Sequence, residues 1–349
     1  MGPTTNRSAI YNSVPTGYPV LNETITLASS TIDLESVPLD GGILVKSLWL
    51  SIDPYLREGM RDPSVKSHLP GFQFGKPIWG FGVVQVLRSE VDGVKPGDFL
   101  RVAEYPFQEY NILPPEHSIT VIMEEEGIPL SLHLGILGMP GQTAFYGLEV
   151  VGKPVKGETI FVSSGASAVG SLVAQLAKAK GLKVIASAGS DDKVAFMKSI
   201  GVDAAFNYKT ESTADVLARE GPIDLYWDNV GGPTLDAALG AFAPGGRVVV
   251  CGIMSEYNTK EPYGIKNTPQ ILFKRLRVEG FYWFLAAETY EGQKDKPERF
   301  MQALVPLIKS GQLKWLEHVY DGIESVGEAI IAVQTGVATA KVVVKVGDI

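Results

Sequence analysis

Two hydrophobic periods alternate along this chain, and the change from one to the other predicts most of its elements. A β-branched run beginning at Ile160 gives way to small residues and then to apolar positions at helical spacing as far as Ala177. This pattern predicts a strand, a tight turn and a helix. The alternation repeats with short links, which predicts a parallel sheet with ligand bound beyond the carboxyl ends of its strands. The expected strands are 160–162, 183–187, 204–207, 225–228, 246–251 and 276–285.

The chain before about residue 130 has a different pattern, rich in strands and turns. Residues 41–53 and 80–88 are predicted strands, and the region as a whole predicts a small β domain. Between these strands, the step from Asp53 into a proline favours extended backbone, so Tyr55 begins a turn. Side chains at such turns often face a cleft, and the alternative for Tyr55 is packing in the core.

Three further elements complete the expected architecture. The stretch 129–151 predicts two helices separated by a loop at 138–143, just before the first strand of the parallel sheet. An amphipathic helix, 300–309, is predicted to end at a Ser-Gly pair. A final strand, 341–346, is expected to return to the first domain.

The turn after the first strand of the parallel sheet resembles a dinucleotide-binding fingerprint. Gly165 and Gly170 hold the first and third glycine positions of G-x-G-x-x-G, and Ser167 stands at the second. Small residues there allow a tight turn, close approach of backbone to a pyrophosphate and close helix packing. An ordinary α/β turn is the alternative, because the motif is incomplete.

The end of the second predicted strand indicates which nicotinamide nucleotide would bind. Readers of NAD usually place a carboxylate there for the ribose 2′-hydroxyl, whereas this chain has 187–190, Ser-Ala-Gly-Ser. Asp191 and Asp192 suit the first turn of the next helix, and Lys193 follows them. A lysine, a hydroxyl and a helix N-terminus suit a 2′-phosphate, so we expect NADPH. The alternative is that Lys193 is a solvated surface lysine.

Polar and glycine-rich segments follow the next three strands and should meet at the same edge of the sheet. Tyr208 closes the third strand and is a candidate for stacking or hydrogen bonding near the adenosine phosphate. Asn229 follows the fourth strand and has both a donor and an acceptor for ribose or amide groups. Backbone at Gly252 and Ile253, after the fifth strand, is expected to approach the nicotinamide.

Composition limits the class of protein. A chain of 349 residues exceeds one ordinary core and predicts two domains, and 45% hydrophobic with 20% charged residues is typical of soluble globular proteins. A net charge of −8 argues against nucleic acid or an anionic membrane as partner. No run approaches 18 apolar residues, and the N-terminus has no apolar core for export.

The cysteine and histidine content argues against a metal site. Cys251 is the single cysteine, which excludes an intramolecular disulfide and fits a reducing, cytoplasmic location. Together with the four histidines it shows no ligand-like spacing, so we expect no zinc. The histidines are His68, His117, His133 and His318.

A set of linked motifs resembles the zinc-independent branch of the medium-chain dehydrogenase/reductase superfamily, in its prostaglandin-reductase and alkenal double-bond reductase group. The similarity extends over nearly the whole chain and is far more selective than the glycine turn. One departure is the pair Ala338 and Ala340, where the family often has Asn and Gly, so a cofactor contact there is not expected. The motifs lie at 50–57, 137–144, 189–193, 206–209, 228–232 and 251–258.

The resemblance implies an α/β protein with a GroES-like β-rich domain and a Rossmann domain. The expected domains are 1–135 with 305–349, and 136–304. It also implies NADPH, reduction of the carbon–carbon double bond of enals and enones, and a homodimer joined through edge strands. The residues expected to bind the cofactor are Gly165, Ser167, Ala168, Val169, Gly170, Gly189, Ser190, Lys193, Tyr208, Asn229, Cys251, Gly252, Ile253, Ser255, Tyr257, Phe281, Tyr282 and Trp283.

The expected chemistry requires little of the protein beyond placement and one proton. NADPH carries the hydride, so the protein must orient the substrate β-carbon and stabilise the oxygen that becomes an enolate. A neutral phenol suits this role because it donates a hydrogen bond without a buried charge. Tyr257 is the first candidate and Tyr55 the second, and the ribose of the cofactor is a further one.

Three other functions remain open from the sequence. Quinones are an alternative acceptor for the same hydride, and an intermediate of secondary metabolism is another possible substrate. A nucleotide-binding sensor without turnover is the alternative from a different class, because a shared fold does not establish an activity.

Overall fold

The computed structural model describes residues 2–283 and 297–349, which form two compact units. Of these residues, the first unit holds 2–134 and 317–349, and the second holds 135–283 and 297–316. Within the described ranges, every helix is too short or too polar to cross a membrane.

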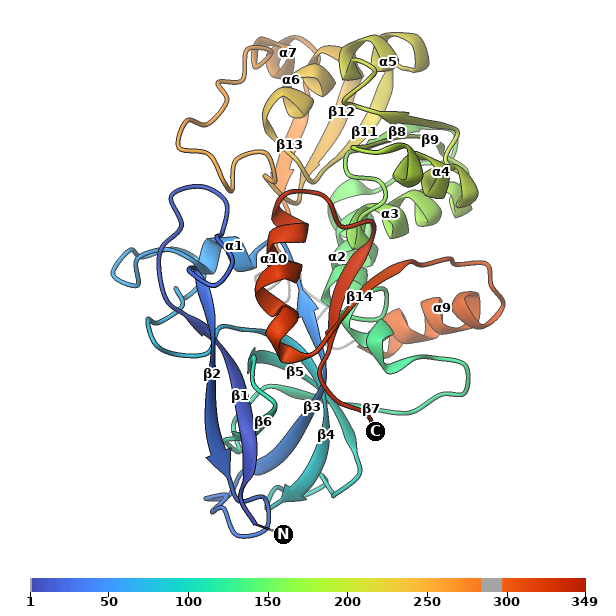
Figure 1. The fold of residues 1–349 in the computed structure, drawn as a ribbon. Coiled ribbons are helices and arrows are strands. Elements are labelled where there is room, and N and C mark those ends of the chain that lie inside the picture. Colours follow the sequence, from blue (N-terminus) through green and yellow to red (C-terminus); the bar gives the residue numbers. More distant parts are fainter. Residues whose placement is uncertain (1, 284–296) are drawn as a thin grey trace. The chain divides into compact units, whose positions relative to one another are not determined.

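The first unit is built on a mainly antiparallel sheet that the C-terminal segment completes, with β14 (Glu317–Asp321) and β15 (Lys341–Lys345) paired in parallel (Figure 1). The last strand pairs with the third in antiparallel register, from Val342 opposite Ile52 to Lys345 opposite Trp49, which confirms the predicted return of the chain. In spatial order the strands are β14 (Glu317–Asp321), β15 (Lys341–Lys345), β3 (Ile43–Ile52), β4 (Trp79–Ser89), β5 (Phe99–Pro106) and β7 (Ile119–Ile122), while β6 (Tyr110–Leu113) also pairs with β3.

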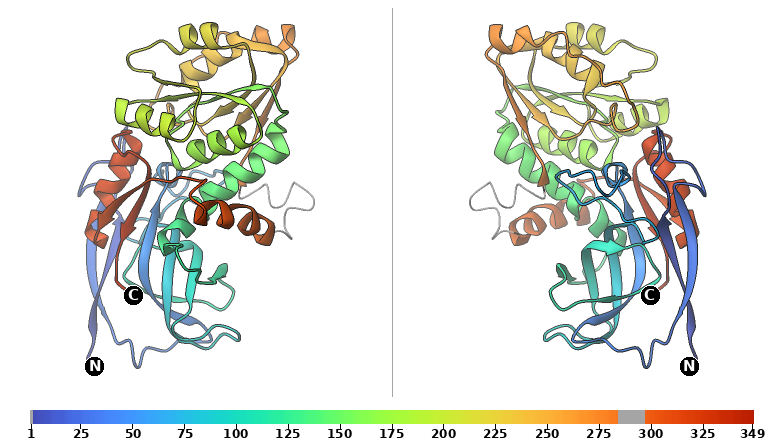
Figure 2. Two further views of the ribbon diagram at one scale, coloured as in Figure 1. Left: turned by 90° about the vertical axis from the view of Figure 1, so that its right-hand side faces the viewer. Right: turned by 90° about the vertical axis from the view of Figure 1, so that its left-hand side faces the viewer.

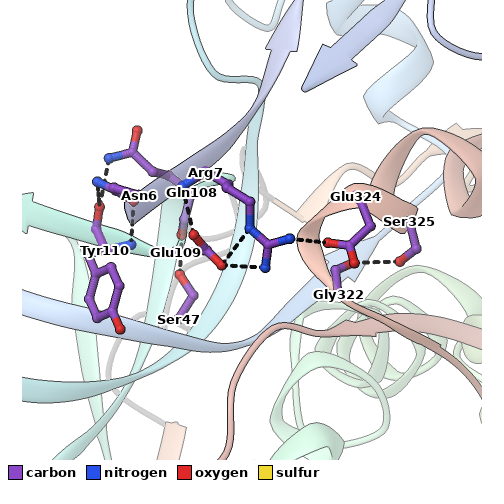
Figure 3. Close-up of polar contacts among 9 residues, drawn as sticks. All are labelled: Asn6, Arg7, Ser47, Gln108, Glu109, Tyr110, Gly322, Glu324 and Ser325. Carbon is purple, nitrogen blue, oxygen red and sulfur yellow. Dashed lines mark hydrogen bonds and ion pairs between the residues drawn. The ribbon is translucent and has the colours of Figure 1, made fainter. Parts of the chain in front are cut away.

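A separate hairpin, β1 (Thr4–Tyr11) with β2 (Ile25–Ile32), joins this sheet to the C-terminal helices of the same unit. Figure 2 shows the hairpin beside helix α10 (Val326–Gln334) in both views. Arg7 on β1 pairs with Glu109 at 2.7 Å and with Glu324 in the 3-10 helix η3 (Ile323–Ser325) at 2.9 Å (Figure 3). One guanidinium therefore links three segments that are far apart in the sequence.

Two short helices of the first unit lie at the ends of strands. Helix α1 (Leu56–Gly59) follows β3, and the 3-10 helix η1 (Leu130–Leu134) precedes the second unit. The core beneath the sheet is aliphatic and aromatic, with Leu50, Val84 and Val344 fully buried. The other positions of these three strands are buried or half-buried as well, so both faces of the sheet are largely covered here.

The second unit is a parallel sheet with the strand order β10-β9-β8-β11-β12-β13. This is the order of a Rossmann fold. The first three strands run from the middle of the sheet to one edge, and the chain then returns to the middle, so that the last three strands run to the other edge. Helix α2 (Met139–Gly147) lies against α3 (Ala168–Ala179), and α5 (Thr213–Glu220) lies against α6 (Gly232–Ala241) (Figure 1). The strands are β8 (Thr159–Val162), β9 (Lys183–Ala188), β10 (Ala204–Asn207), β11 (Ile223–Asp228), β12 (Phe242–Val250) and β13 (Arg277–Gly280).

Helices join these strands and precede the first of them, as the periodicity indicated. They are α2 (Met139–Gly147), the π-helix η2 (Leu148–Gly152), α3 (Ala168–Ala179), α4 (Asp191–Ser199), α5 (Thr213–Glu220), α6 (Gly232–Ala241), α7 (Pro269–Phe273) and α9 (Pro297–Lys309).

Two predicted helix boundaries were wrong. The expected loop at 138–143 is helical from Met139, because Pro140 occupies the first turn, where its missing N–H costs nothing. The last predicted helix begins at Pro297 instead of residue 300 and ends at Lys309 as expected.

Two predicted strand boundaries also differ from the structure. Strand β12 begins at Phe242, four residues before the prediction, and crosses a Pro-Gly-Gly segment through a register shift against β11. The sixth strand, expected at 276–285, is short and exposed at 277–280, and residues 284 and 285 lie outside the described residues.

The expected domain boundary at 304/305 falls inside the continuous helix α9. The structure instead keeps the chain in the second unit as far as Leu316. Gln175 on α3 explains this, because its side chain donates to the Lys314 carbonyl and accepts from the Lys314 N–H, each at 2.9 Å. The segment after α9 is thus held by the second unit.

Candidate functional site

The turn after β8 brings backbone and small side chains together as a phosphate-binding loop requires. Ser164 has a left-handed backbone with a φ of 53°. A Cβ atom at Gly170 would lie 2.3 Å from the Ser164 carbonyl oxygen, and one at Gly165 would lie 2.7 Å from the side chains of Ala186 and Met197. Both glycines are therefore fixed by close packing of helix, turn and strand.

Ser167 caps the helix that follows this turn. Its hydroxyl oxygen accepts a hydrogen bond from the Gly170 N–H at 3.1 Å. Because the oxygen accepts this bond, the hydroxyl proton can still be donated to a ligand, which a glycine at this position could not do. The first N–H groups of a helix have no partner within it, which makes Ala168 and Val169 backbone donors for a phosphate.

The carboxyl ends of β9 and β10 carry a pair of lysines. Tyr208 lies against Gly189, where a Cβ would be 3.0 Å from the phenol oxygen and 3.3 Å from Cε of Lys209. Burial, and then the charge of Lys209, lower the pKa of Lys193. Ser190 is the first residue before α4, so its hydroxyl lies at the N-terminus of that helix. These two lysines stand where an NAD site has a carboxylate at the end of the strand, and the carboxylate of Asp191, at the start of α4, accepts from the Asn207 amide at 2.9 Å.

The end of β11 is a buried hydrogen-bond network. One oxygen of Asp228 accepts from the Tyr226 hydroxyl at 2.6 Å and from the N–H groups of Val230 and Gly231 at 2.9 and 2.8 Å. Burial raises the pKa of this carboxyl group. The network fixes the turn that leads into α6.

Asn229 takes part in the same network. Its amide donates to the Ser163 carbonyl at 2.7 Å and accepts from the Trp227 indole at 3.1 Å. One amide proton and one lone pair are thus used inside the protein, and the residue is 8% exposed. The Asn229 side chain therefore joins the ends of β8 and β11.

The segment after β12 lies against this turn. Burial raises the pKa of Cys251 to about 12, so its thiol stays neutral. A Cβ at Gly252 would lie 3.0 Å from the Asn229 carbonyl oxygen. Ser255 donates its hydroxyl proton to the Val230 carbonyl at 2.7 Å, and so has only lone pairs to offer a ligand. Ile253 is 40% exposed, and Tyr257 is half-buried in the turn that follows.

The three aromatic residues after β13 differ in their surroundings. Phe281 is 3% exposed, and a Cβ at Gly147 would lie 2.8 Å from its ring, so its side chain is packed against α2. Trp283 stacks on Tyr146 with ring centroids 5.1 Å apart, and Tyr282 is half-buried. The Phe281 ring therefore belongs to the core, and its backbone N–H donates to the Val250 carbonyl at 2.9 Å.

Tyr55 belongs to the first unit, at the start of α1. It is the N-cap residue of that helix, and its side chain packs partly against the core of its own unit. Ala338, at one of the two positions where the chain departs from the family, lies in the same core.

Three residues near these sites were not among the sequence candidates. Lys209 is the last residue of the motif at 206–209. Its place next to Tyr208, which was a sequence candidate, was the signal that could have identified it. Asp228 and Ser163 form the network beneath Asn229. Asp228 is the first residue of the motif at 228–232, whereas the role of Ser163 depends on contacts between strands, for which the sequence carries no signal.

The described residues bring together no group of three or more His, Cys, Asp or Glu side chains that could hold a metal ion. The groups that do converge are the glycine turn, a helix N-terminus and two lysines, all at the carboxyl edge of a parallel sheet. This fold and this edge are those of a dinucleotide-binding protein.

Comparison with known proteins makes the assignment narrower. Residues 7–121 match a family profile described as the N-terminal domain of oxidoreductase, and residues 168–296 match one described as zinc-binding dehydrogenase. The chain belongs to the zinc-independent medium-chain dehydrogenase/reductases, in the group of the alkenal and prostaglandin reductases.

Several relatives are similar over almost their whole length. The 2-alkenal reductase (NADP(+)-dependent) of Nicotiana tabacum is 39% identical, over 98% of this chain and 97% of that protein. Prostaglandin reductase 1 of Bos taurus is 35% identical, over 91% and 94%. The structure of CurA from Vibrio vulnificus in complex with NADPH has a TM-score of 0.87 and 30% identity, over 98% of this chain and all of that one.

Proposed function

We propose that this protein is an NADPH-dependent reductase of the carbon–carbon double bond of α,β-unsaturated aldehydes and ketones. The observation that carries the cofactor assignment is the pair Lys193 and Lys209 beside Gly189, where a reader of NAD has a carboxylate. The substrate class rests on the relatives, which include 2-alkenal reductase, prostaglandin reductase 1 and the (+)-pulegone reductase of Mentha piperita, 38% identical over 89% of this chain.

The residues at the sheet edge fit NADPH. We propose that the N-terminus of α3, with the Ser167 hydroxyl, holds the pyrophosphate, because it presents backbone donors after a turn of small residues. Lys193, Tyr208 and Ser190 hold the 2′-phosphate. The backbone at Gly252 and Ile253 is proposed to border the nicotinamide, together with the segment from Phe281 to Trp283.

When bound, NADPH supplies a hydride, which reaches the substrate β-carbon in the proposed reaction. The carbonyl oxygen gains negative charge as the hydride arrives, and a tyrosine hydroxyl donates a hydrogen bond to it. Tyr257 is the first candidate for this donor and Tyr55 the second. The same tyrosine then relays a proton from water to the α-carbon of the enolate, so the phenol is neutral again at the end of the reaction. One such donor contributes about 3 kcal/mol to transition-state stabilisation, or roughly 150-fold in rate.

A turnover panel tests the proposal. NADPH oxidation is measured with matched enals, enones, quinones, saturated aldehydes and saturated ketones. We expect turnover with the enals and enones, with products that keep the carbonyl group. Faster turnover of quinones would establish the alternative acceptor, and no turnover with any substrate would favour a sensor.

The two tyrosines are tested in the same assay. Tyr257→Phe and Tyr55→Phe remove only a hydroxyl, so their NADPH affinity serves as the internal control. We expect the variant that lacks the donor to lose turnover number while keeping cofactor affinity. The tyrosine step is wrong if both variants keep the turnover number of the parent enzyme.

We further propose that β13 joins two copies of the chain. It is an exposed edge strand, with alternating Arg277, Val278 and Glu279, and Leu272 and Phe273 on nearby α7 are 75% and 73% exposed. Antiparallel pairing about a two-fold axis at Val278 places Arg277 opposite Glu279 of the partner subunit, twice. The strand is thus self-complementary in charge.

Light scattering after size exclusion tests this pairing. Arg277→Glu puts like charges opposite each other and should shift the protein to monomer, and adding Glu279→Arg should restore the dimer. A parent protein that is monomeric at micromolar concentration contradicts the proposal.

A further inference from the structure

A buried lysine of the first unit directs all of its donors at the three residues that precede the Tyr55 turn. Lys341 Nζ lies 2.7 Å from Oδ1 of Asp53, 2.6 Å from Oγ of Ser51 and 3.2 Å from the carbonyl oxygen of Ile52. The side chains of Lys341 and Asp53 are each 5% exposed. An ammonium group has three protons, and this arrangement uses all of them.

The Ser51 hydroxyl closes the network. It donates to the second carboxylate oxygen of Asp53 at 2.5 Å while its oxygen receives the lysine proton. Both carboxylate oxygens are therefore fixed, one by the lysine and one by the serine. Lys341 on β15, although distant in sequence, thus fixes the side chains at the end of β3.

Strand pairing alone does not explain this buried charge. Strands β3 and β15 already share a backbone ladder from Ile52 to Trp49. A buried ion pair is often no more stabilising than apolar side chains of the same volume, because both charges lose their hydration. What the pair does provide is a fixed direction, since charge-assisted hydrogen bonds are short and directional.

The segment held in this way leads directly into Tyr55. The Asp53 carbonyl accepts from the Leu56 N–H at 3.2 Å and so forms the first turn of α1. Gln334 on α10 donates to the next carbonyl, that of Pro54, at 2.9 Å. The backbone on the N-terminal side of Tyr55 is therefore held by two side chains from the C-terminal segment, Lys341 and Gln334.

We infer that Lys341 is a positioning residue for Tyr55 in the reaction, acting through Asp53 and Ser51. This inference rests on the proposed function, in which Tyr55 is the second candidate, after Tyr257, for the donor to the substrate oxygen. The ammonium group touches neither substrate nor cofactor in this account. Its effect is to keep the phenol where the reaction needs it, and misplacement of a catalytic group by about 1 Å can cost roughly 100-fold in rate.

A double-mutant cycle separates positioning from simple stabilisation. Turnover number at saturating NADPH and enone is measured for Lys341→Met in the parent chain and in the Tyr55→Phe chain, below the unfolding temperature of every variant. We expect Lys341→Met to lower the turnover number by about 10-fold or more in the parent and by less than about 2-fold when the Tyr55 hydroxyl is absent. NADPH affinity, measured by titration, should stay unchanged.

The matched control is another partly buried ion pair, Arg247 with Glu158, which lies at the amino end of β8 in the other unit. Arg247→Met should lower the unfolding temperature and leave the turnover number unchanged in both chains. If Lys341→Met does not fold, Ser51→Ala replaces it in the same cycle, because that change removes one link and leaves the ion pair intact.

The outcomes test the positioning role of Lys341 and the donor role of Tyr55 separately. Equal loss of turnover in the two chains, or full turnover in a folded Lys341→Met or Ser51→Ala protein, overturns the positioning role while the donor role of Tyr55 stands. Full turnover of Tyr55→Phe itself overturns the donor role, and the positioning role with it.

Discussion

Replacing Lys193 with alanine should change the choice between NADPH and NADH. Lys193 stands on the first turn of α4, beside the cation of Lys209. If the 2′-phosphate lies between them, Lys193→Ala removes one charge-assisted hydrogen bond, which contributes about 2 kcal/mol. That corresponds to roughly 30-fold in the Kd for NADPH and no change in the Kd for NADH.

The pH dependence of binding follows from the same contact. Burial and Lys209 lower the pKa of Lys193 in the free protein, so the lysine loses its proton at a lower pH than an exposed one. A bound phosphate favours the charged form and raises that pKa. NADPH affinity should therefore be full below the pKa of the free protein and fall as pH rises through it, while NADH affinity stays level.

Calorimetric titration with both nucleotides at two pH values measures these effects. Lys198→Ala, on the exposed last turn of the same helix, is the control and should change neither affinity. The assignment of the 2′-phosphate site is refuted if NADPH and NADH bind with equal affinity and Lys193→Ala changes neither affinity.

Three other perturbations have defined outcomes. Gly170→Ala brings a Cβ to 2.3 Å from the Ser164 carbonyl and should weaken NADPH binding at least 10-fold by titration; normal affinity would show that the turn is not the cradle. Asn229→Ala breaks two buried hydrogen bonds and should lower stability by about 2–4 kcal/mol in urea unfolding, so an unchanged midpoint would contradict the network. Burial, with the charge of Arg101, lowers the pKa of His133 to about 4. The unfolded chain takes up this proton near pH 6.5, so stability should fall by about 3 kcal/mol from pH 6.5 to pH 4, and His133→Leu should remove that slope.

The sequence predicts the second unit well because its strands are buried on both faces. Their apolar runs and the helical periods between them predict a parallel sheet, and β8 to β11 lie within a few residues of prediction. Boundaries fail where local signals compete, as at Pro140, which can end one helix or begin another. The domain boundary fails because Gln175 holds Lys314, a contact across 139 residues.

The candidate site is predictable in its backbone and less so in its side chains. Glycines and a helix cap leave a local pattern, so the turn from Gly165 to Gly170 is visible in the sequence. Asn229 also belongs to a motif, yet the structure shows that its amide joins two strands. Lys341 and Asp53 are far apart in the chain, and only the register of β15 on β3 brings them together. Long-range pairing of this kind has no local signature.

The account depends most directly on where the hydride goes. NADPH carrying deuterium at the transferring position of C4 is reacted with an enone, and the product is examined by NMR. We predict one deuterium on the β-carbon and an intact carbonyl group. Deuterium on the carbinol carbon, or none in the product, would contradict reduction of the double bond.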